Sequence, residues 1–186
     1  MNIYLIRHGE TKSNTERRYM GITDVPLSAS GRSELIQKKD EGYYPEYNGQ
    51  LVFTSALSRT QETLKLIYGE VEYVVDPRFN EMNFGDFDNK TYEEIKDNPV
   101  YQIWISGEHY GNVTPNGESF NMLKDRVLEA YKDAVAAGKR ANKDVIIVTH
   151  SGPIVAIKES LHPGVNKSFY EWSIKNGEFY QIKRGF

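Results

Sequence analysis

The stretch Met1-Asn2-Ile3-Tyr4-Leu5-Ile6-Arg7-His8-Gly9-Glu10-Thr11-Lys12-Ser13-Asn14 opens the chain and decides the class of fold. A short apolar run leads directly into Arg7, His8 and Gly9, which predicts a buried strand that ends in a polar turn. In open α/β sheets, ligands bind at the carboxyl ends of the strands. His8 is therefore the first candidate for a functional residue, and Arg7 lies beside it.

A second apolar run, residues 144–149, also ends in a histidine, His150. Ser151, Gly152 and Pro153 follow, and we expect Pro153 at the first position of a helix that continues to Leu161. Two parallel strands that each end in a histidine would bring His8 and His150 together at one edge of the sheet.

The rest of the chain alternates short apolar runs with helical patterns, which favours an α/β fold with a mostly parallel sheet. We expect strands at residues 51–53 and 71–75. We expect helices from Ser28 to Gly42, from Ser58 (with Gln61 as a capping box) to Tyr68, and from Ser119 to Gly138. The tail predicts a hairpin with arms 169–175 and 178–184 around Asn176-Gly177, paired antiparallel at the sheet edge.

Residues 78–118 break this rhythm and are rich in Asn, Gly and aromatic residues. One helix is expected from Thr91, with Glu94 completing a capping box. We interpret the segment as a cap over the site, inserted into a single domain that spans residues 1–186. Glu81, in this cap, is the candidate proton donor.

The bulk composition fits one soluble globular domain of 186 residues, 39% hydrophobic and 26% charged. No apolar run could span a bilayer and the chain begins with a strand pattern, so we expect a cytoplasmic protein without membrane contact. The lack of cysteine excludes disulfides, thiolate metal sites and a cysteine nucleophile. A net charge of -3 argues against nucleic acid as a partner.

The candidate residues form a cationic cluster. Arg7, Arg59 and the two histidines, together with the helix starts after Ser55 and Ser151, are suited to a phosphate dianion. Taken singly, each histidine could be a residue that only packs in the core. Arg59 could be an ordinary helix arginine, and Glu81 could be a solvated carboxylate. Their common position at strand ends and loop starts favours a site.

Leu5-Ile6-Arg7-His8-Gly9-Glu10-Thr11 resembles the signature of the histidine phosphatase (phosphoglycerate mutase-like) superfamily. Four further blocks follow in that family's order: Asn14, Pro26-Leu27-Ser28 with Gly31, residues 55–60, and residues 148–152. The resemblance implies a three-layer α/β/α sandwich with a mixed, mostly parallel sheet, and no metal or other cofactor. It implies that His8 is the nucleophile that becomes phosphohistidine and that Glu81 is the acid. The implied phosphate ligands are Arg7, Asn14, Arg59, His150 and Ser151.

The chemistry sets requirements on these groups. His8 must be neutral to attack phosphorus, and neighbouring arginines favour the neutral form. We expect a protonated His150 to stabilise charge on the transferring group, and a closed cap to raise the pKa of Glu81.

The cap suggests which branch of the family is present. Met82 follows Glu81 where the mutase branch has arginine, and an Arg-Arg pair is missing from the cap, so mutase activity is not expected. Residues 79–87 and 114–118 are similar to the cap blocks of α-ribazole phosphatases of cobalamin nucleotide-loop assembly, although Phe87-Asp88-Asn89 departs from their usual Trp-Glu-Gly. Seven aromatic residues either contact a benzimidazole base or form the cap's own core: Phe84, Phe87, Tyr92, Tyr101, Trp104, Tyr110 and Phe120.

Three functions stay open at this point. The first is a phosphatase for α-ribazole 5'-phosphate, and the second is a phosphatase for sugar phosphates or many small phosphomonoesters. The third is a module that binds phosphorylated ligands without catalysis. The oligomeric state is open as well, because the tail could close a sheet edge or pair with another chain.

Overall fold

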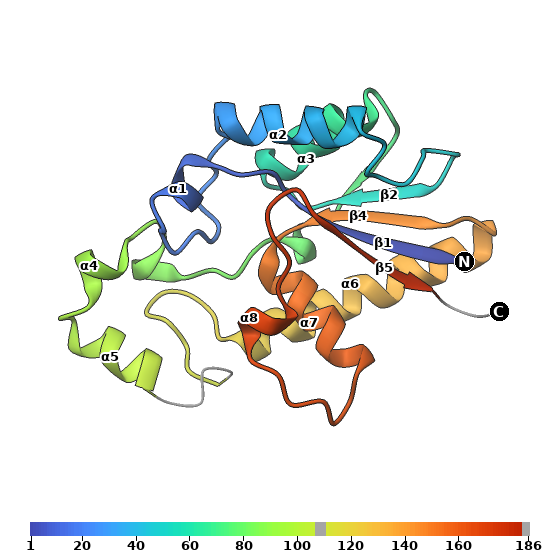
Figure 1. The fold of residues 1–186 in the computed structure, drawn as a ribbon. Helices are drawn as coiled ribbons and strands as arrows, with labels where there is room; N and C mark the ends of the chain where they lie inside the picture. The colour runs from blue at the N-terminus through green and yellow to red at the C-terminus, as the bar shows by residue number, and fades with distance from the viewer. Residues whose placement is uncertain (107–110, 184–186) are drawn as a thin grey trace.

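The computed structural model describes residues 1–106 and 111–183, and Figure 1 shows a central sheet with helices on both faces. Within these residues the sheet has five strands in the order β3-β2-β4-β1-β5. The strands are β1 (Asn2–Arg7), β2 (Leu51–Thr54), β3 (Val74–Val75), β4 (Val145–Thr149) and β5 (Phe179–Lys183). The first four run parallel and β5 is antiparallel to β1. The predicted α/β class with a mixed, mostly parallel sheet is confirmed.

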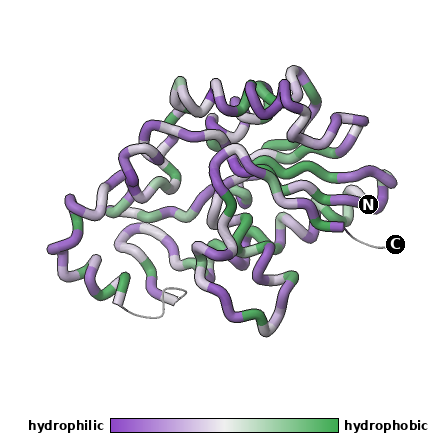
Figure 2. The backbone as a smooth tube through the Cα atoms, viewed as in Figure 1, coloured by the Kyte–Doolittle hydropathy of each residue, from purple (hydrophilic) through white to green (hydrophobic). Residues whose placement is uncertain are grey.

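Two pairs of helices cover the sheet (Figure 1). Helices α2 (Ala29–Asp40) and α3 (Ser58–Tyr68) lie on one face, while α6 (Phe120–Ala141) and α7 (Ser151–Leu161) lie on the other. Alternate residues of each strand serve the two cores, as strand geometry requires: Leu5 packs on the α6–α7 side and Ile6 on the α2–α3 side. Figure 2 shows the hydrophobic residues gathered along the central strands.

Strand β4 is buried at all five positions because it has a strand on each side and helices on each face. This explains its uninterrupted apolar sequence.

The remaining helical segments are short. They are α1 (Lys12–Thr15), η1 (Pro77–Phe79), η2 (Gly85–Phe87), α4 (Tyr92–Ile95), α5 (Pro99–Ser106) and α8 (Phe169–Trp172). The capping box of Thr91 and Glu94 begins α4 as predicted, and Ser28 and Ser119 cap α2 and α6. Helices α1, α5 and α8 were not predicted.

Residues 77–106 extend past the carboxyl ends of the strands (Figure 1). Phe87, Ile95 and Tyr101 form a small buried cluster there, with Phe84 and Trp104 against it. Of the seven cap aromatics, Tyr110 lies outside the described residues. Among the described residues, no helix is both long and apolar enough to cross a membrane.

Two helix starts differ from the prediction. Ser58 and Gln61 form no capping box: Ser58 is the first residue of α3, and Asp24 Oδ1 accepts hydrogen bonds from its N–H (2.9 Å) and hydroxyl (2.8 Å). A residue remote in sequence thus supplies the acceptor. Pro153 is the third residue of α7 rather than the first, since the helix begins directly after His150.

The predicted C-terminal hairpin is wrong, although its antiparallel pairing at the sheet edge is right. Only β5 is a strand, and it pairs with β1. Residues 169–172 are helical because Ser168 and Glu171 form a capping box. The Gly177 N–H instead donates to the carbonyl oxygens of Arg7 and His8, both at 3.1 Å. Strand β3 is shorter than predicted, and residue 184 lies outside the described residues.

Gly138 does not end α6, which continues to Ala141 and closes at the left-handed Asn142 (φ 50°). A Cβ atom on Gly138 would lie 2.6 Å from Cγ2 of Val145 and 2.9 Å from Sδ of Met1. Glycine is therefore present because the helix approaches β4 closely.

We expect Gly138→Val to lower the free energy of unfolding by about 1–3 kcal/mol through overpacking. Helix propensity alone would favour valine over glycine, so a loss must come from this contact. Urea denaturation measures it, with Lys139→Val at the exposed neighbouring position as control. A Gly138→Val protein as stable as the wild type would contradict the close approach.

Candidate active site

His8 follows β1 directly and is buried. Its N–H donates to the carbonyl of Thr149 at 3.0 Å, which continues the pairing with β4. Its Nδ1 lies 2.7 Å from the carbonyl oxygen of Gly9. Because a carbonyl only accepts, Nδ1 carries the proton, and in the neutral ring Nε2 keeps a free electron pair.

Burial, followed by the charges of Arg59 and Arg7, holds the pKa of His8 well below its ordinary value. The hydrogen bond to Gly9 opposes this only in part. His8 is therefore neutral near pH 7, as a nucleophile must be.

His150 lies beside His8 as expected, with ring centroids 5.0 Å apart and an interplanar angle of 62°. Nδ1 of His150 accepts a hydrogen bond from Arg59 Nε at 3.3 Å, and Nε2 of His150 lies 2.8 Å from Ser55 Oγ. Burial and then Arg59 hold the pKa of His150 well below its ordinary value. His150 is therefore neutral in this state, because Nδ1 must be unprotonated to accept from a guanidinium. The expected protonated form concerns the site with the transferring group bound and stays a prediction.

The two arginines are held by main-chain carbonyls. Arg59 is fully buried and donates from Nη1 to Thr23 O (3.0 Å) and from Nη2 to Gly21 O (2.6 Å). Burial lowers its pKa to about 10, so it stays charged at neutral pH. Arg7 donates from Nη1 to Ile174 O at 2.6 Å, while its buried Nε is without a partner in the described residues.

Glu81 reaches the same edge of the sheet from the segment after η1. Its Oε1 accepts from the N–H groups of Met82 (2.9 Å) and Gly152 (3.1 Å), and its Oε2 lies 3.2 Å from the Gly152 nitrogen. Burial raises the pKa of Glu81 above its ordinary value despite these hydrogen bonds and the nearby Arg7. A Cβ atom on Gly152 would clash with Oε1, so only glycine allows this approach.

Asn14 and Ser151 lie near the cluster with their side chains engaged. Asn14 Oδ1 accepts from the N–H and hydroxyl of Thr11, both at 3.0 Å, and Thr11 Oγ1 in return accepts from the Asn14 N–H at 3.3 Å and so caps α1. Ser151 Oγ lies 2.6 Å from Ser173 Oγ. In this state Asn14 Oδ1 and Ser151 Oγ are therefore both engaged in hydrogen bonds within the protein.

Sequence reasoning missed several supporting residues. Asn176 Nδ2 donates to the carbonyl of His8 at 3.1 Å. Asp88 accepts from the N–H groups of Gly21 (2.6 Å) and Thr23 (2.7 Å), and so fixes the loop whose carbonyls hold Arg59. These contacts join main-chain atoms to remote side chains, so no local pattern signals them.

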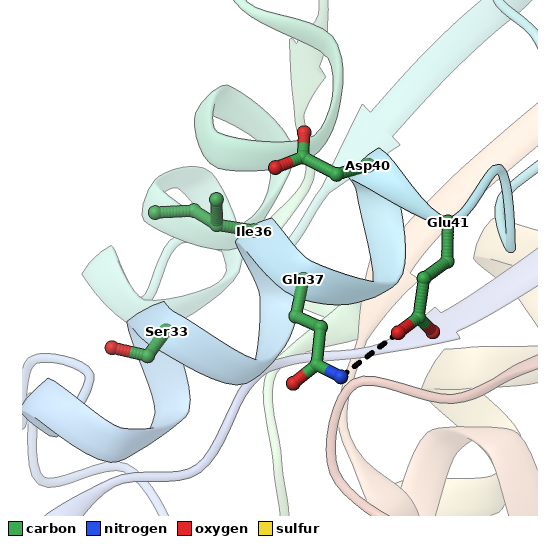
Figure 3. A pocket seen from close by; sticks show the side chains of 5 residues that line it. All are labelled: Ser33, Ile36, Gln37, Asp40 and Glu41. Carbon is green, nitrogen blue, oxygen red and sulfur yellow. Dashed lines mark hydrogen bonds between the residues drawn. The ribbon is translucent and has the colours of Figure 1, made fainter.

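The surface hollow in Figure 3 is elsewhere, on the outer face of α2. Its lining contains Asp40 and Glu41 but no cation, so it is unsuited to phosphate. Among the described residues, no group of three or more His, Asp or Glu side chains is placed to hold a metal ion.

Comparisons with known proteins agree with this geometry. A model of the "Histidine phosphatase superfamily (branch 1)" matches residues 3–185. Phosphoglycerate mutase-like protein 4 of Arabidopsis thaliana is 31% identical over 170 residues, 89% of this chain and 73% of that protein. The uncharacterized phosphatase PhoE of Bacillus subtilis (strain 168) is 29% identical over 164 residues, 87% of this chain and 78% of that protein. The solved structure of the alpha-ribazole phosphatase from Shigella flexneri has a TM-score of 0.84 and 26% identity, and the match covers 100% of this chain and 91% of that one.

We expect nitrogen NMR of ¹⁵N-histidine-labelled protein at pH 6.5 to show opposite neutral tautomers, with the proton on Nδ1 of His8 and on Nε2 of His150. An ordinary histidine is about half protonated at this pH. His8→Asn and His150→Asn variants assign the signals. An imidazolium signal from either residue at pH 6.5 would contradict the hydrogen-bond pattern.

Proposed function

The chain belongs to the histidine phosphatase superfamily, and we propose that it is a phosphomonoesterase that acts through a phosphohistidine at His8. The observation that carries the proposal is the neutral His8, whose Nδ1 is bound to Gly9 so that Nε2 is free, beside Arg7 and Arg59. We propose a small phosphate ester as the substrate.

In the first step His8 Nε2 attacks phosphorus and the bond from phosphorus to the ester oxygen breaks. Glu81 gives its proton to the departing oxygen, and its raised pKa keeps the acid form available. Oε2 suits this role, because it accepts one N–H group, that of Gly152, whereas Oε1 accepts those of Met82 and Gly152. General acid catalysis of this kind contributes roughly a hundred- to ten-thousand-fold.

In the second step water attacks the phosphohistidine. The Glu81 carboxylate takes a proton from that water as the bond between nitrogen and phosphorus breaks. Inorganic phosphate leaves, and neutral His8 and protonated Glu81 are restored.

The cationic groups act on the oxygens of the transferring group. Arg7 and Arg59 stabilise their charge with guanidinium donors in a dry site, where electrostatic interactions are strong. A bound dianion would also favour protonation of His150. Arg59 Nε would then have to leave Nδ1 of His150, which frees that donor for the phosphate. Asn14 would contribute through its Nδ2 donor, and Ser151 after its hydroxyl leaves Ser173.

As the specific substrate we propose α-ribazole 5'-phosphate, in cobalamin nucleotide-loop assembly in the cytoplasm. The support is the structural match to the Shigella flexneri enzyme over the whole of this chain and the similarity of residues 79–87 and 114–118 to the cap blocks of α-ribazole phosphatases. The aromatic residues add less support, because Phe87 and Tyr101 are buried in the cap's own cluster. The buried Met82 after Glu81 lacks the charge that would bind a second anionic group, so mutase activity is not proposed.

The second candidate keeps the chemistry and broadens the substrate to sugar phosphates or many small esters. The similarity to PhoE, a phosphatase whose name states no substrate, favours it. A binding module without catalysis would need neither a free nucleophilic nitrogen nor a buried acid, so we place it last.

We expect kcat/KM for α-ribazole 5'-phosphate to exceed that for each member of a sugar-phosphate panel by about tenfold or more. Phosphate release under identical conditions measures it, and His8→Ala serves as the blank. If α-ribazole 5'-phosphate ranks among the poor substrates while others are hydrolysed, the broad-specificity candidate replaces the first.

A further inference from the structure

Arg126 of α6 binds the main chain around Glu81. Its Nη1 donates to the carbonyl oxygens of Arg78 and Asn80, both at 2.8 Å, and its Nη2 donates to that of Glu81 at 3.0 Å. A planar guanidinium presents its donors in a fixed geometry, so these three bonds set both the position and the direction of the segment.

Glu118 holds Arg126 and binds the other side of the same segment. Its Oε2 accepts from Arg126 Nε (3.1 Å), and its Oε1 accepts from Arg126 Nη2 (2.5 Å) and from the N–H of Asn83 (2.8 Å). The Glu118 N–H donates to Asn83 O at 2.9 Å. The main chain is thus fixed before and after Glu81.

The pair is largely shielded from water. The side chains of Arg126 and Glu118 are 24% and 12% exposed, and a bidentate pair in such a place is screened less than a surface pair. The segment after η1 has no regular secondary structure at Glu81, so its position depends on contacts of this kind.

We propose that Arg126, held by Glu118, is a positioning residue for proton transfer by Glu81. It sets the main chain from which the Glu81 carboxyl group extends toward the leaving-group oxygen. The proposal rests on the proposed function, and it concerns only the step in which the ester oxygen receives a proton.

The chain offers a matched control in Arg78. This arginine also connects the segment to α6, through Glu129 (3.2 Å) and Asp133 (2.9 Å), and it pairs with Asp76 (2.7 Å) within the segment. Its α6 partners are 71% and 65% exposed, and its guanidinium contacts are to carboxylates rather than to the main chain at Glu81. Arg78→Met therefore removes cross-links of the same kind without releasing Glu81.

The test uses the leaving group, because p-nitrophenolate departs without a proton and an alcohol does not. The ratio kcat/KM reports the steps through release of the alcohol, so hydrolysis of the phosphohistidine does not enter. For α-ribazole 5'-phosphate, whose leaving group is an alcohol, we expect Arg126→Met to lower kcat/KM about a hundredfold, as a displacement of about 1 Å can do. For p-nitrophenyl phosphate we expect a change of only a few-fold. Glu81→Gln should show the same substrate dependence with a larger loss of kcat/KM. Arg78→Met should leave kcat/KM unchanged for both substrates.

Arg126→Lys provides a second variant, which keeps the positive charge but loses the planar guanidinium. We expect its kcat/KM to lie between those of the wild type and Arg126→Met, with the same substrate dependence. Equal losses on both substrates, or no loss, in a folded Arg126 variant would overturn the proposal while leaving the phosphatase function intact. A Glu81→Gln protein without substrate dependence would overturn both this proposal and the acid role of Glu81. A wild-type protein inactive on both esters would instead overturn the proposed function.

Discussion

The parallel pairing of β1 with β4 is the constraint on which the rest of the site depends. The register places Arg7 opposite Thr149, and the hydrogen bond from His8 N to Thr149 O continues it by one residue. Neighbouring strands lie about 4.8 Å apart, so the histidines that follow them meet with ring centroids 5.0 Å apart. Since both strands are central and covered on two faces, the rings are also dry, and burial is the first cause of their lowered pKa values.

This arrangement places cations where water is scarce, which costs desolvation free energy. Main-chain carbonyls offset part of the cost, those of Gly21 and Thr23 for Arg59 and that of Ile174 for Arg7. Glu81 supplies a nearby group of opposite charge when ionised. A site built in this way favours a dianion, which would satisfy the remaining donors and neutralise the excess charge.

The sequence predicted the elements whose signals are local. The continuous apolar runs of β1 and β4, the turn after each, and the caps at Ser28 and Thr91 depend on adjacent residues only. The predictions were wrong where a residue remote in sequence determines the local structure. Asp24 caps α3, and the contact with Val145 explains Gly138. The carbonyl of Ile174, which a hairpin would have paired with the opposite arm, accepts from Arg7 instead. The roles of Arg126 and Asn176 were not predicted for the same reason, since both side chains bind main-chain carbonyl oxygens, which carry no sequence signal. The charge of His150 in the ligand-free site could not be predicted from the sequence, because it depends on the direction of a single N–H bond, that of Arg59 Nε.

The central claim is that His8 Nε2 takes the phosphoryl group. Rapid mixing with a ³²P-labelled phosphate ester, followed by quenching in acid or in base, tests it most directly. We predict a phosphoenzyme that is stable in base, labile in acid and absent in His8→Ala. It should be present in His162→Ala, because His162 lies at the end of α7, where it stacks on Trp172. A His8→Ala protein that keeps full activity, or a label that survives acid, would contradict the account.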